Sequence, residues 1–302
     1  LGRKQTFAFD RTFLYEAAVT GHGRGFAMAT VARGITYPDR ELDVLLGTPR
    51  AHSLDRWIFV ITAAWFIVIV LAGFLPDSVR IIGAVQSGQR PPFPLIMHVH
   101  AVLTGSFLLL LLAQATLMAM GRSALHMRLG LLAFLLVPAL VVVGLNLASV
   151  MYHQIWDALQ AAPPGPEHNR LEAALARSDN AKLIQIRTGI LFPFLMALAV
   201  FARTRDAGFH KRMVFLATAV SFPAAVNRMT WLPSELPASF IASDFYLLAA
   251  IAPLFVWDVY RNHYVHRAYW LWLALFVPAS LAVNLLWDTP WWHGVARAMM
   301  GV

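Results

Sequence analysis

The feature that most constrains this chain is a series of apolar blocks, each about as long as a bilayer is thick. A helix rises ~1.5 Å per residue, so roughly 20 apolar residues cross a hydrocarbon core about 30 Å thick. Inside a bilayer every backbone polar group must be satisfied within the protein, which favours helices. We therefore expect an all-α polytopic membrane bundle of about seven transmembrane helices, one leading helix followed by three hairpins. The blocks cover residues 57–75, 95–118, 129–151, 183–202, 212–230, 239–257 and 268–287.

The composition agrees with the bilayer as solvent. Of 302 residues, 59% are hydrophobic and only 13% are charged, which is about half the charged fraction of a soluble domain. The net charge of +8 lies in short loops between the blocks, so we expect no nucleic-acid partner. The absence of cysteine excludes disulfides, thiolate metal sites and cysteine nucleophiles.

The fifth block is the weakest of the seven. It contains Pro223, Asn227 and Arg228, yet the run from residue 213 to 226 is almost uniformly apolar. Prolines are tolerated in membrane helices, so we predict that this block also spans.

Lysine and arginine in the flanking loops predict the orientation. The N-terminal region and the even-numbered loops carry 16 of them, against 7 on the other side. We expect a bacterial inner membrane protein with a cytoplasmic N-terminal region (1–56), a transmembrane domain (57–290) and an external C-terminal tail (291–302). Residues 1–27 lack apolar periodicity and are read as an upstream extension without a function.

One long external loop is expected at residues 152–182. Pro166 followed by Leu171 and Leu175 predicts a short amphipathic helix within it. That helix would act as a lid over the bundle or as an interfacial foot without a functional role.

The cytoplasmic turns repeat a pattern of arginine and histidine placed 12 or 13 residues before a proline. Anchoring under the positive-inside rule is the favoured interpretation, and an anion or lipid-headgroup site is the alternative. The candidate residues in these basic turns are Arg122, His126, Arg128, His210 and Arg212.

Polar side chains gather about one helical turn inside the predicted outer surface, where polar groups are costly. Helical spacing places several of them on stripes with other polar residues, and inward-facing stripes would line an outward-opening crevice. The alternative is that these side chains reach water and headgroups without converging. We expect the opposite charges of Arg187 and Asp244 to pair. The candidate ligand-binding or cofactor-binding residues are His100, His153, Arg187, Asn227, Arg228, Asp244 and Asn284.

His98 and His100 resemble a metal pair, but two residues apart on a helix they point ~200° apart. No metal site is assigned, and His98 stays a candidate only if this stretch is extended. Haem b is permitted with His100 and His153 on the outer side, or with His126 and His210 on the inner side. The cofactor itself stays open.

Several enzyme and receptor classes find no support. No predicted span contains a lysine for a retinal Schiff base. The metalloprotease, phosphate-loop and serine-hydrolase motifs are also absent.

A pattern across residues 95–232 resembles a family of bacterial predicted membrane proteins known only as a domain of unknown function. It runs from His100 and Gln114 through Arg122, Leu125-His126 and Leu129-Gly130 to His210-Lys-Arg212. This chain departs from the family by Met127, where arginine is usual, and by Met213 directly after Arg212. The resemblance supports the topology and the choice of His100, Gln114, His126 and His210, and it implies no reaction.

Three functions are carried forward. The first is an integral membrane protein that binds a small molecule or cofactor in a polar crevice in the outer half of the bundle. The second is a haem b or quinone-linked redox protein. The third is a scaffold without a ligand, whose only partner is the lipid bilayer.

Overall fold

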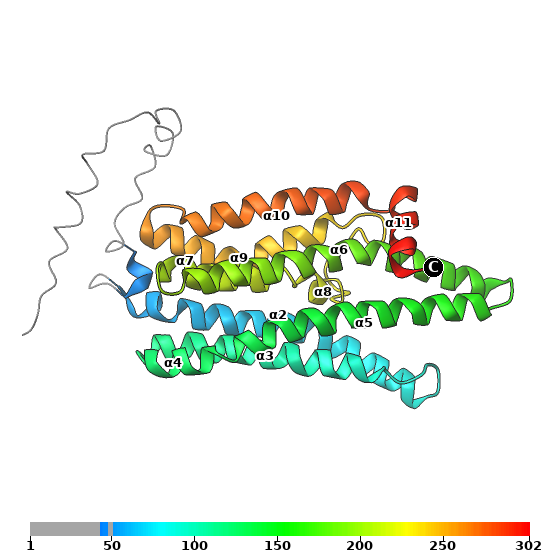
Figure 1. Cartoon of the computed structure of the whole chain (residues 1–302), viewed down its shortest axis with the longest axis horizontal. Coiled ribbons are helices and arrows are strands. Elements are labelled where there is room, and N and C mark those ends of the chain that lie inside the picture. Colours follow the sequence, from blue (N-terminus) through cyan, green and yellow to red (C-terminus); the bar gives the residue numbers. More distant parts are fainter. Residues whose placement is uncertain (1–42, 48–50) are drawn as a thin grey trace, which may run out of the picture. The chain divides into compact units, whose positions relative to one another are not determined.

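The computed structural model describes residues 43–47 and 51–302, and helices are the only regular elements in that part of the chain. The expected N-terminal region therefore lies mostly outside the described residues. The long helices lie side by side along the bundle (Figure 1). In chain order the helices are η3 (Val44–Leu46), α2 (Ser53–Gln86), α3 (Leu95–Ala119), α4 (Ser123–Gly130), α5 (Ala133–Ala161), α6 (Pro166–Ala202), α7 (Ala207–Ala219), α8 (Pro223–Val226), α9 (Ile241–Asn262), α10 (Arg267–Leu286) and α11 (Pro290–Met300).

Six helical segments of the described chain are long and apolar enough to cross a membrane. They are α2, α3, α4 together with α5, α6, α9 and α10. Large apolar side chains on their outer faces, such as Leu135 and Val142 on α5, stay exposed, as side chains in contact with lipid do. The chain is a multi-pass helical membrane protein.

The fifth predicted span is a broken helix, so the expected count of seven is not confirmed. α7 ends at Ala219, and the chain continues through short turns to Pro223, where α8 begins. Proline has no backbone N–H and interrupts the helical ladder. Side chains satisfy part of the freed backbone, because Trp272 Nε1 donates to the carbonyl of Leu216 at 3.0 Å.

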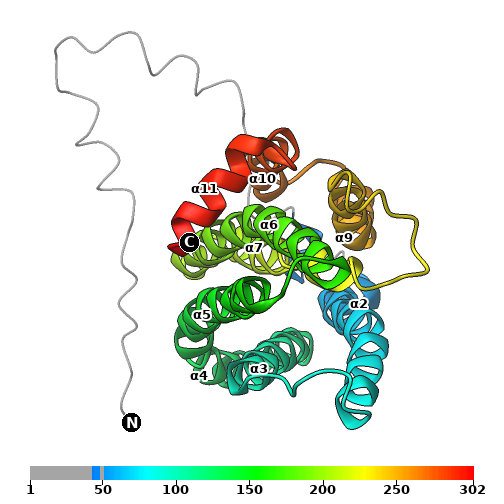
Figure 2. The same cartoon turned by 90° about the vertical axis from the view of Figure 1, so that its right-hand side faces the viewer.

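The broken helix α7–α8 lies at the centre of the bundle rather than against lipid. Met213, Leu216 and Val220 are completely buried, and α7 contacts α6, α9 and α10. α8 packs against α2 so closely that a methyl group at Gly73 would overlap the Ala225 carbonyl. The end-on view shows α7 surrounded by these neighbours (Figure 2).

The expected external loop at 152–182 is helical instead. α5 continues to Ala161 and α6 starts at Pro166, so only residues 162–165 connect them. The amphipathic segment is thus the first part of α6, which continues into the apolar run as one helix. Most of the expected tail, residues 291–302, is helical, because α11 runs from Pro290 to Met300.

The two ends of the bundle are named after a buried charged residue that each contains. At one end α2, α7 and α10 begin and α9 finishes; we call it the Asp258 end, and sequence analysis predicts that it is cytoplasmic. At the other end α6 and α9 begin and α10 finishes, and we call it the Arg187 end. In Figure 1 the Asp258 end is on the left and the Arg187 end, with α11, is on the right.

Candidate functional site

The predicted pair of Arg187 and Asp244 is present. Arg187 projects from α6 with its side chain 2% exposed, and its Nη1 donates to Asp244 Oδ1 at 2.7 Å. Asp244 lies in the first turn of α9 and is also buried. An isolated charge at this depth would cost several kcal/mol, so each residue makes the other tolerable.

α10 completes the surroundings of the Asp244 carboxylate. Its Oδ2 accepts a hydrogen bond from the hydroxyl of Ser280 and a longer one, 3.4 Å, from the Asn284 amide. Ser280 and Asn284 lie one turn apart on α10, as their spacing predicts. Three helices therefore hold this carboxylate in one position.

Only one of the three nitrogen atoms of the Arg187 guanidinium, Nη1, has a hydrogen-bond partner. Its carbon lies 5.3 Å from the ring centre of Phe240 and 5.2 Å from that of Phe276. Nε and Nη2 are buried, and neither has a hydrogen-bond partner. Buried polar groups are nearly always hydrogen-bonded, so two free donors on a charged group require an explanation.

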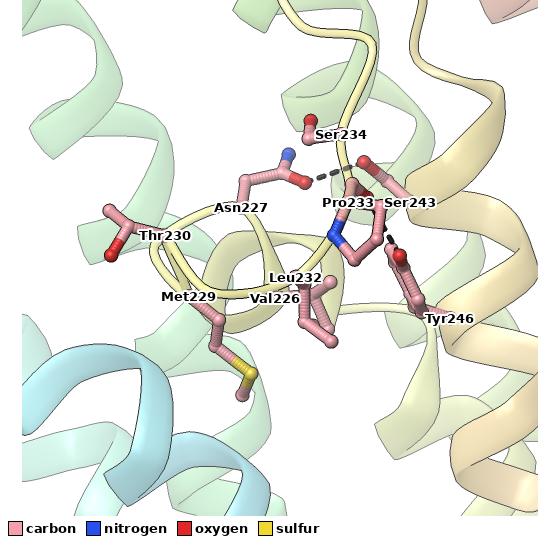
Figure 3. A pocket seen from close by; sticks show the side chains of 9 residues that line it. All are labelled: Val226, Asn227, Met229, Thr230, Leu232, Pro233, Ser234, Ser243 and Tyr246. Carbon is pink, nitrogen blue, oxygen red and sulfur yellow. Dashed lines mark hydrogen bonds between the residues drawn. The ribbon is translucent and has the colours of Figure 1, made fainter.

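A cavity of about 230 Å³ lies between the end of α8 and the start of α9, and neither Arg187 nor Asp244 lines it. Asn227 and Ser243 form part of its wall and are joined by a hydrogen bond from the serine hydroxyl to the asparagine oxygen (Figure 3). Tyr246, which donates to the carbonyl of Pro233 at 2.7 Å, forms another part. Ser243 directly precedes Asp244, so the cavity wall and the ion pair share the first turn of α9.

The structure does not join the other predicted stripes to this cluster. His100 packs on α5 next to Gly144, where a methyl group would lie 3.6 Å from its ring, and its buried Nδ1 has no partner. His153 Nδ1 is 3.0 Å from the carbonyl of Ser149 on its own helix. The Arg228 side chain is 38% exposed, and it pairs with Asp77 at 3.3 Å. Of the predicted residues, Arg187, Asp244 and Asn284 converge, and Asn227 joins them through Ser243.

No metal site is found in the described residues. His98 is exposed on α3 and contacts the ring of Phe93. No group of three or more histidine or acidic side chains in residues 43–47 and 51–302 could hold a metal ion.

His126 and His210 share one arrangement at the Asp258 end. His126 Nδ1 lies 3.3 Å from the carbonyl of Gln114, and His210 Nδ1 lies 2.8 Å from that of Ala199. A carbonyl can only accept, so each Nδ1 carries the proton and each Nε2 keeps its lone pair.

Arg212 departs from the expectation for the basic turns. Arg122 and Arg128 are exposed as predicted, but Arg212 is completely buried. Its Nε and Nη2 donate side-on to Asp258, with Nη2 at 2.7 Å from Oδ1, and its Nη1 donates to Asp43 at 2.8 Å. The reason is that two carboxylates meet it inside the bundle, one from α9 and one from the segment before η3.

Sequence analysis missed the acidic partners at the Asp258 end. Asp258 also accepts from the Tyr269 hydroxyl at 2.8 Å. Asp55, buried in the first turn of α2, accepts from Nε and Nη2 of Arg261 at 2.9 and 2.8 Å. The available signal was a lone carboxylate next to an apolar run on each helix, and such a carboxylate requires a cation.

Electrostatics at this end shift two groups outside the spans. Burial would raise the pKa of the Asp43 carboxyl, but the hydrogen bond and charge of Arg212 lower it below its ordinary value. Burial, reinforced by the charge of Arg212, lowers the pKa of His266 to about 4. His266 is therefore neutral at pH 7, and its Nδ1 accepts the backbone N–H of Ala268 at the start of α10.

A second cluster that sequence analysis missed fastens α11 at the Arg187 end. Asp179 on α6 is fully buried and accepts from the Tyr152 hydroxyl at 2.7 Å. Its other oxygen lies 3.0 Å from His293 Nδ1 and 3.3 Å from Arg297 Nε, both on α11. Lys182, which was expected outside the spans, lies within α6 and donates to the carbonyl of Ala148.

Comparisons of the chain with models of protein families, with curated proteins and with solved structures find no match. The resemblance across residues 95–232 stays a prediction, and the function must be argued from the site itself.

Proposed function

We propose that this membrane protein binds a small molecule at the Arg187 end, with the guanidinium of Arg187 as the main contact. The observation that carries the proposal is the pair of buried, unpartnered donors on Arg187, Nε and Nη2. A buried donor without a partner costs about 1–3 kcal/mol, and more on a charged group. A ligand that accepts hydrogen bonds would remove that cost when it binds.

The neighbouring groups have supporting roles in this proposal. Asp244 holds the guanidinium, and Ser280 and Asn284 hold the Asp244 carboxylate. Asn227 and Ser243 would line the approach from the cavity of about 230 Å³. Under the arginine and lysine asymmetry this end faces outward from a bacterial inner membrane, which fits a receptor or a transporter for an external solute.

Compounds that co-purify with the protein test this proposal. The purified full chain is compared with Arg187→Lys and with Arg228→Lys, which alters an exposed arginine outside the cluster. We expect mass spectrometry of extracts to find at least one compound in the wild type and the Arg228 variant that is depleted from the Arg187 variant. Identical extracts from all three proteins contradict the proposal.

A redox function is the second candidate, supported by His126 and His210. Their Nδ1 atoms are held by backbone carbonyls, which is the arrangement that orients histidine Nε2 toward a metal. These two residues would hold haem b, which would supply one-electron chemistry. A Soret band of the purified chain that shifts on dithionite reduction supports this candidate, and a featureless visible spectrum contradicts it.

A further inference from the structure

Among the described residues, Arg187, Arg212 and Arg261 each bind a buried carboxylate, and they differ in one respect. A guanidinium offers Nε–H and one Nη2–H side by side, a fork that matches the two oxygens of a carboxylate. In Arg212 this fork holds Asp258, and in Arg261 it holds Asp55. In Arg187 the same two atoms, Nε and Nη2, are buried and have no partner.

Asp244 cannot fill the fork of Arg187 by a small rotation. It meets the guanidinium on Nη1, at the other edge of the group. Its second oxygen is held by Ser280 and Asn284 from α10. Turning the carboxylate toward Nε would break these bonds, so the acceptor for the fork must come from elsewhere.

We infer that the ligand of the Arg187 site is a small carboxylate, bound side-on by Nε and Nη2. This inference rests on the proposed function and names its substrate class. Phe240 and Phe276 lie about 5 Å from the guanidinium carbon. Side-on binding uses the plane of the guanidinium, which leaves its faces to the aromatic rings.

Arg212 shows that this chain accommodates an arginine between two carboxylates. Its Nη1 binds Asp43 and its fork binds Asp258. Arg187 repeats half of this arrangement, with Asp244 on Nη1 and an empty fork. A ligand carboxylate takes the place that Asp258 has at Arg212.

The neighbouring cavity limits the size of the ligand. Its volume of about 230 Å³ is below the 300–1,000 Å³ of typical drug-sized pockets. Val226, Met229 and Leu232 form apolar parts of its wall, and Asn227, Ser243 and Tyr246 form polar parts. In this inference the carboxylate binds the fork and the remainder of the ligand reaches this cavity, which fits a monocarboxylate of a few carbon atoms.

Thermal unfolding of the full chain in one detergent tests the inference. The probes are sodium butyrate and sodium benzoate, with benzamide as the neutral analogue of benzoate and inorganic phosphate as a tetrahedral anion, all at constant ionic strength. We expect a carboxylate to raise the melting temperature in proportion to the logarithm of its concentration, and benzamide and phosphate to have no effect. Arg187→Lys keeps the charge but lacks the fork, so the dissociation constant should rise at least tenfold; Arg228→Lys should bind like the wild type.

The outcomes separate the inference from the proposed function. Carboxylates without effect on the wild type, or with equal effect on Arg187→Lys, overturn the inference. Binding of benzamide or phosphate that Arg187→Lys abolishes also overturns it, but upholds ligand binding at Arg187. If no probe shifts the melting temperature and the extracts of wild type and Arg187→Lys are identical, both fail.

Discussion

At the scale of single residues, the pair of Arg187 and Asp244 gives the sharpest prediction of stability. Asp244→Asn leaves a buried guanidinium without a counter-charge and should cost about 3–5 kcal/mol. Adding Arg187→Gln removes the stranded charge and should restore part of the loss. The measurement is the free energy of unfolding of both single variants and the double variant in one detergent.

The exposed pair of Arg80 and Asp77 is the control for this cycle. Its two atoms are 2.6 Å apart, but the Arg80 side chain is 74% exposed. Arg80→Gln should therefore change stability by less than about 1 kcal/mol. A double variant at 187 and 244 that is no more stable than the worse single variant would show that the two charges are not coupled.

His266 makes stability depend on pH in a defined window. Its pKa is lowered to about 4 by burial and by Arg212, whereas the unfolded side chain titrates near 6.5. Between pH 6.5 and pH 4 the His266 side chain binds a proton in the unfolded state but not in the folded state. The free energy of unfolding is therefore highest above pH 6.5 and falls as the pH is lowered toward 4. The loss should reach about 3 kcal/mol, measured as the free energy of unfolding at several pH values.

The matched variant for this window is His266→Asn, which keeps an acceptor for the Ala268 N–H but does not titrate. Burial would raise the pKa of Asp43 and Asp206, but hydrogen bonds and nearby cations lower both pKa values. The stability that these two carboxylates contribute is therefore lost at a lower pH than the window of His266. The variant should show a flatter pH profile between 6.5 and 4. Parallel profiles for variant and wild type would rule out His266 as the source.

The sequence predicts single polar residues well where their cost is high. Arg187 and Asp244 were predicted to pair because neither charge is stable alone at that depth. His100, His153 and Arg228 were assigned to the same crevice from helical spacing alone. Spacing gives the face of a helix but not its rotation toward a neighbour, so their real contacts with Gly144, Ser149 and Asp77 were not predictable.

At the scale of helices, the contact between α2 and α8 depends on one glycine. A methyl group at Gly73 would overlap the backbone of Ala225, so Gly73→Ala should force the helices apart and cost about 1–3 kcal/mol. Gly83 on the same helix has nothing within 4 Å of its Cβ position. Gly83→Ala should be neutral or stabilise the helix by about 0.5–1 kcal/mol, since alanine restricts the unfolded chain.

Melting temperatures of these two variants check the contact. Equal melting temperatures for Gly73→Ala and Gly83→Ala would mean that α8 does not lie against α2. The glycine spacing itself carries no signal in the sequence, because both positions lie in the same apolar helix.

The predicted bounds of the helices are wrong where a helix continues through an expected loop or ends inside an expected span. α5 and α6 extend past the predicted loop because residues 152–182 are rich in alanine, leucine, glutamate, glutamine and arginine, which all favour helix. The break after α7 was not predicted, because hydropathy shows only that residues 213–226 are apolar. It does not show that α6, α9 and α10 enclose them. Apolar character therefore identified the element but not its place in the bundle.

At the scale of the whole molecule, the predicted topology is open to a direct test. The arginine and lysine count places the N-terminal region inside, and α7–α8 must cross for the C-terminus to lie outside. A C-terminal alkaline phosphatase fusion should be active, and a fusion ending after Asn262 should be inactive. An inactive C-terminal fusion together with an active fusion after Asn262 would mean that the orientation is the reverse of the predicted one.

The central claim is that the Arg187 fork holds a ligand. The most direct measurement is an experimental structure of the full chain in lipid nanodiscs with a saturating small carboxylate, at a resolution that separates ligand from water. The account predicts non-protein density with two oxygens within hydrogen-bonding distance of Nε and Nη2 of Arg187. A fork occupied by a protein oxygen, or by water molecules alone, would contradict it.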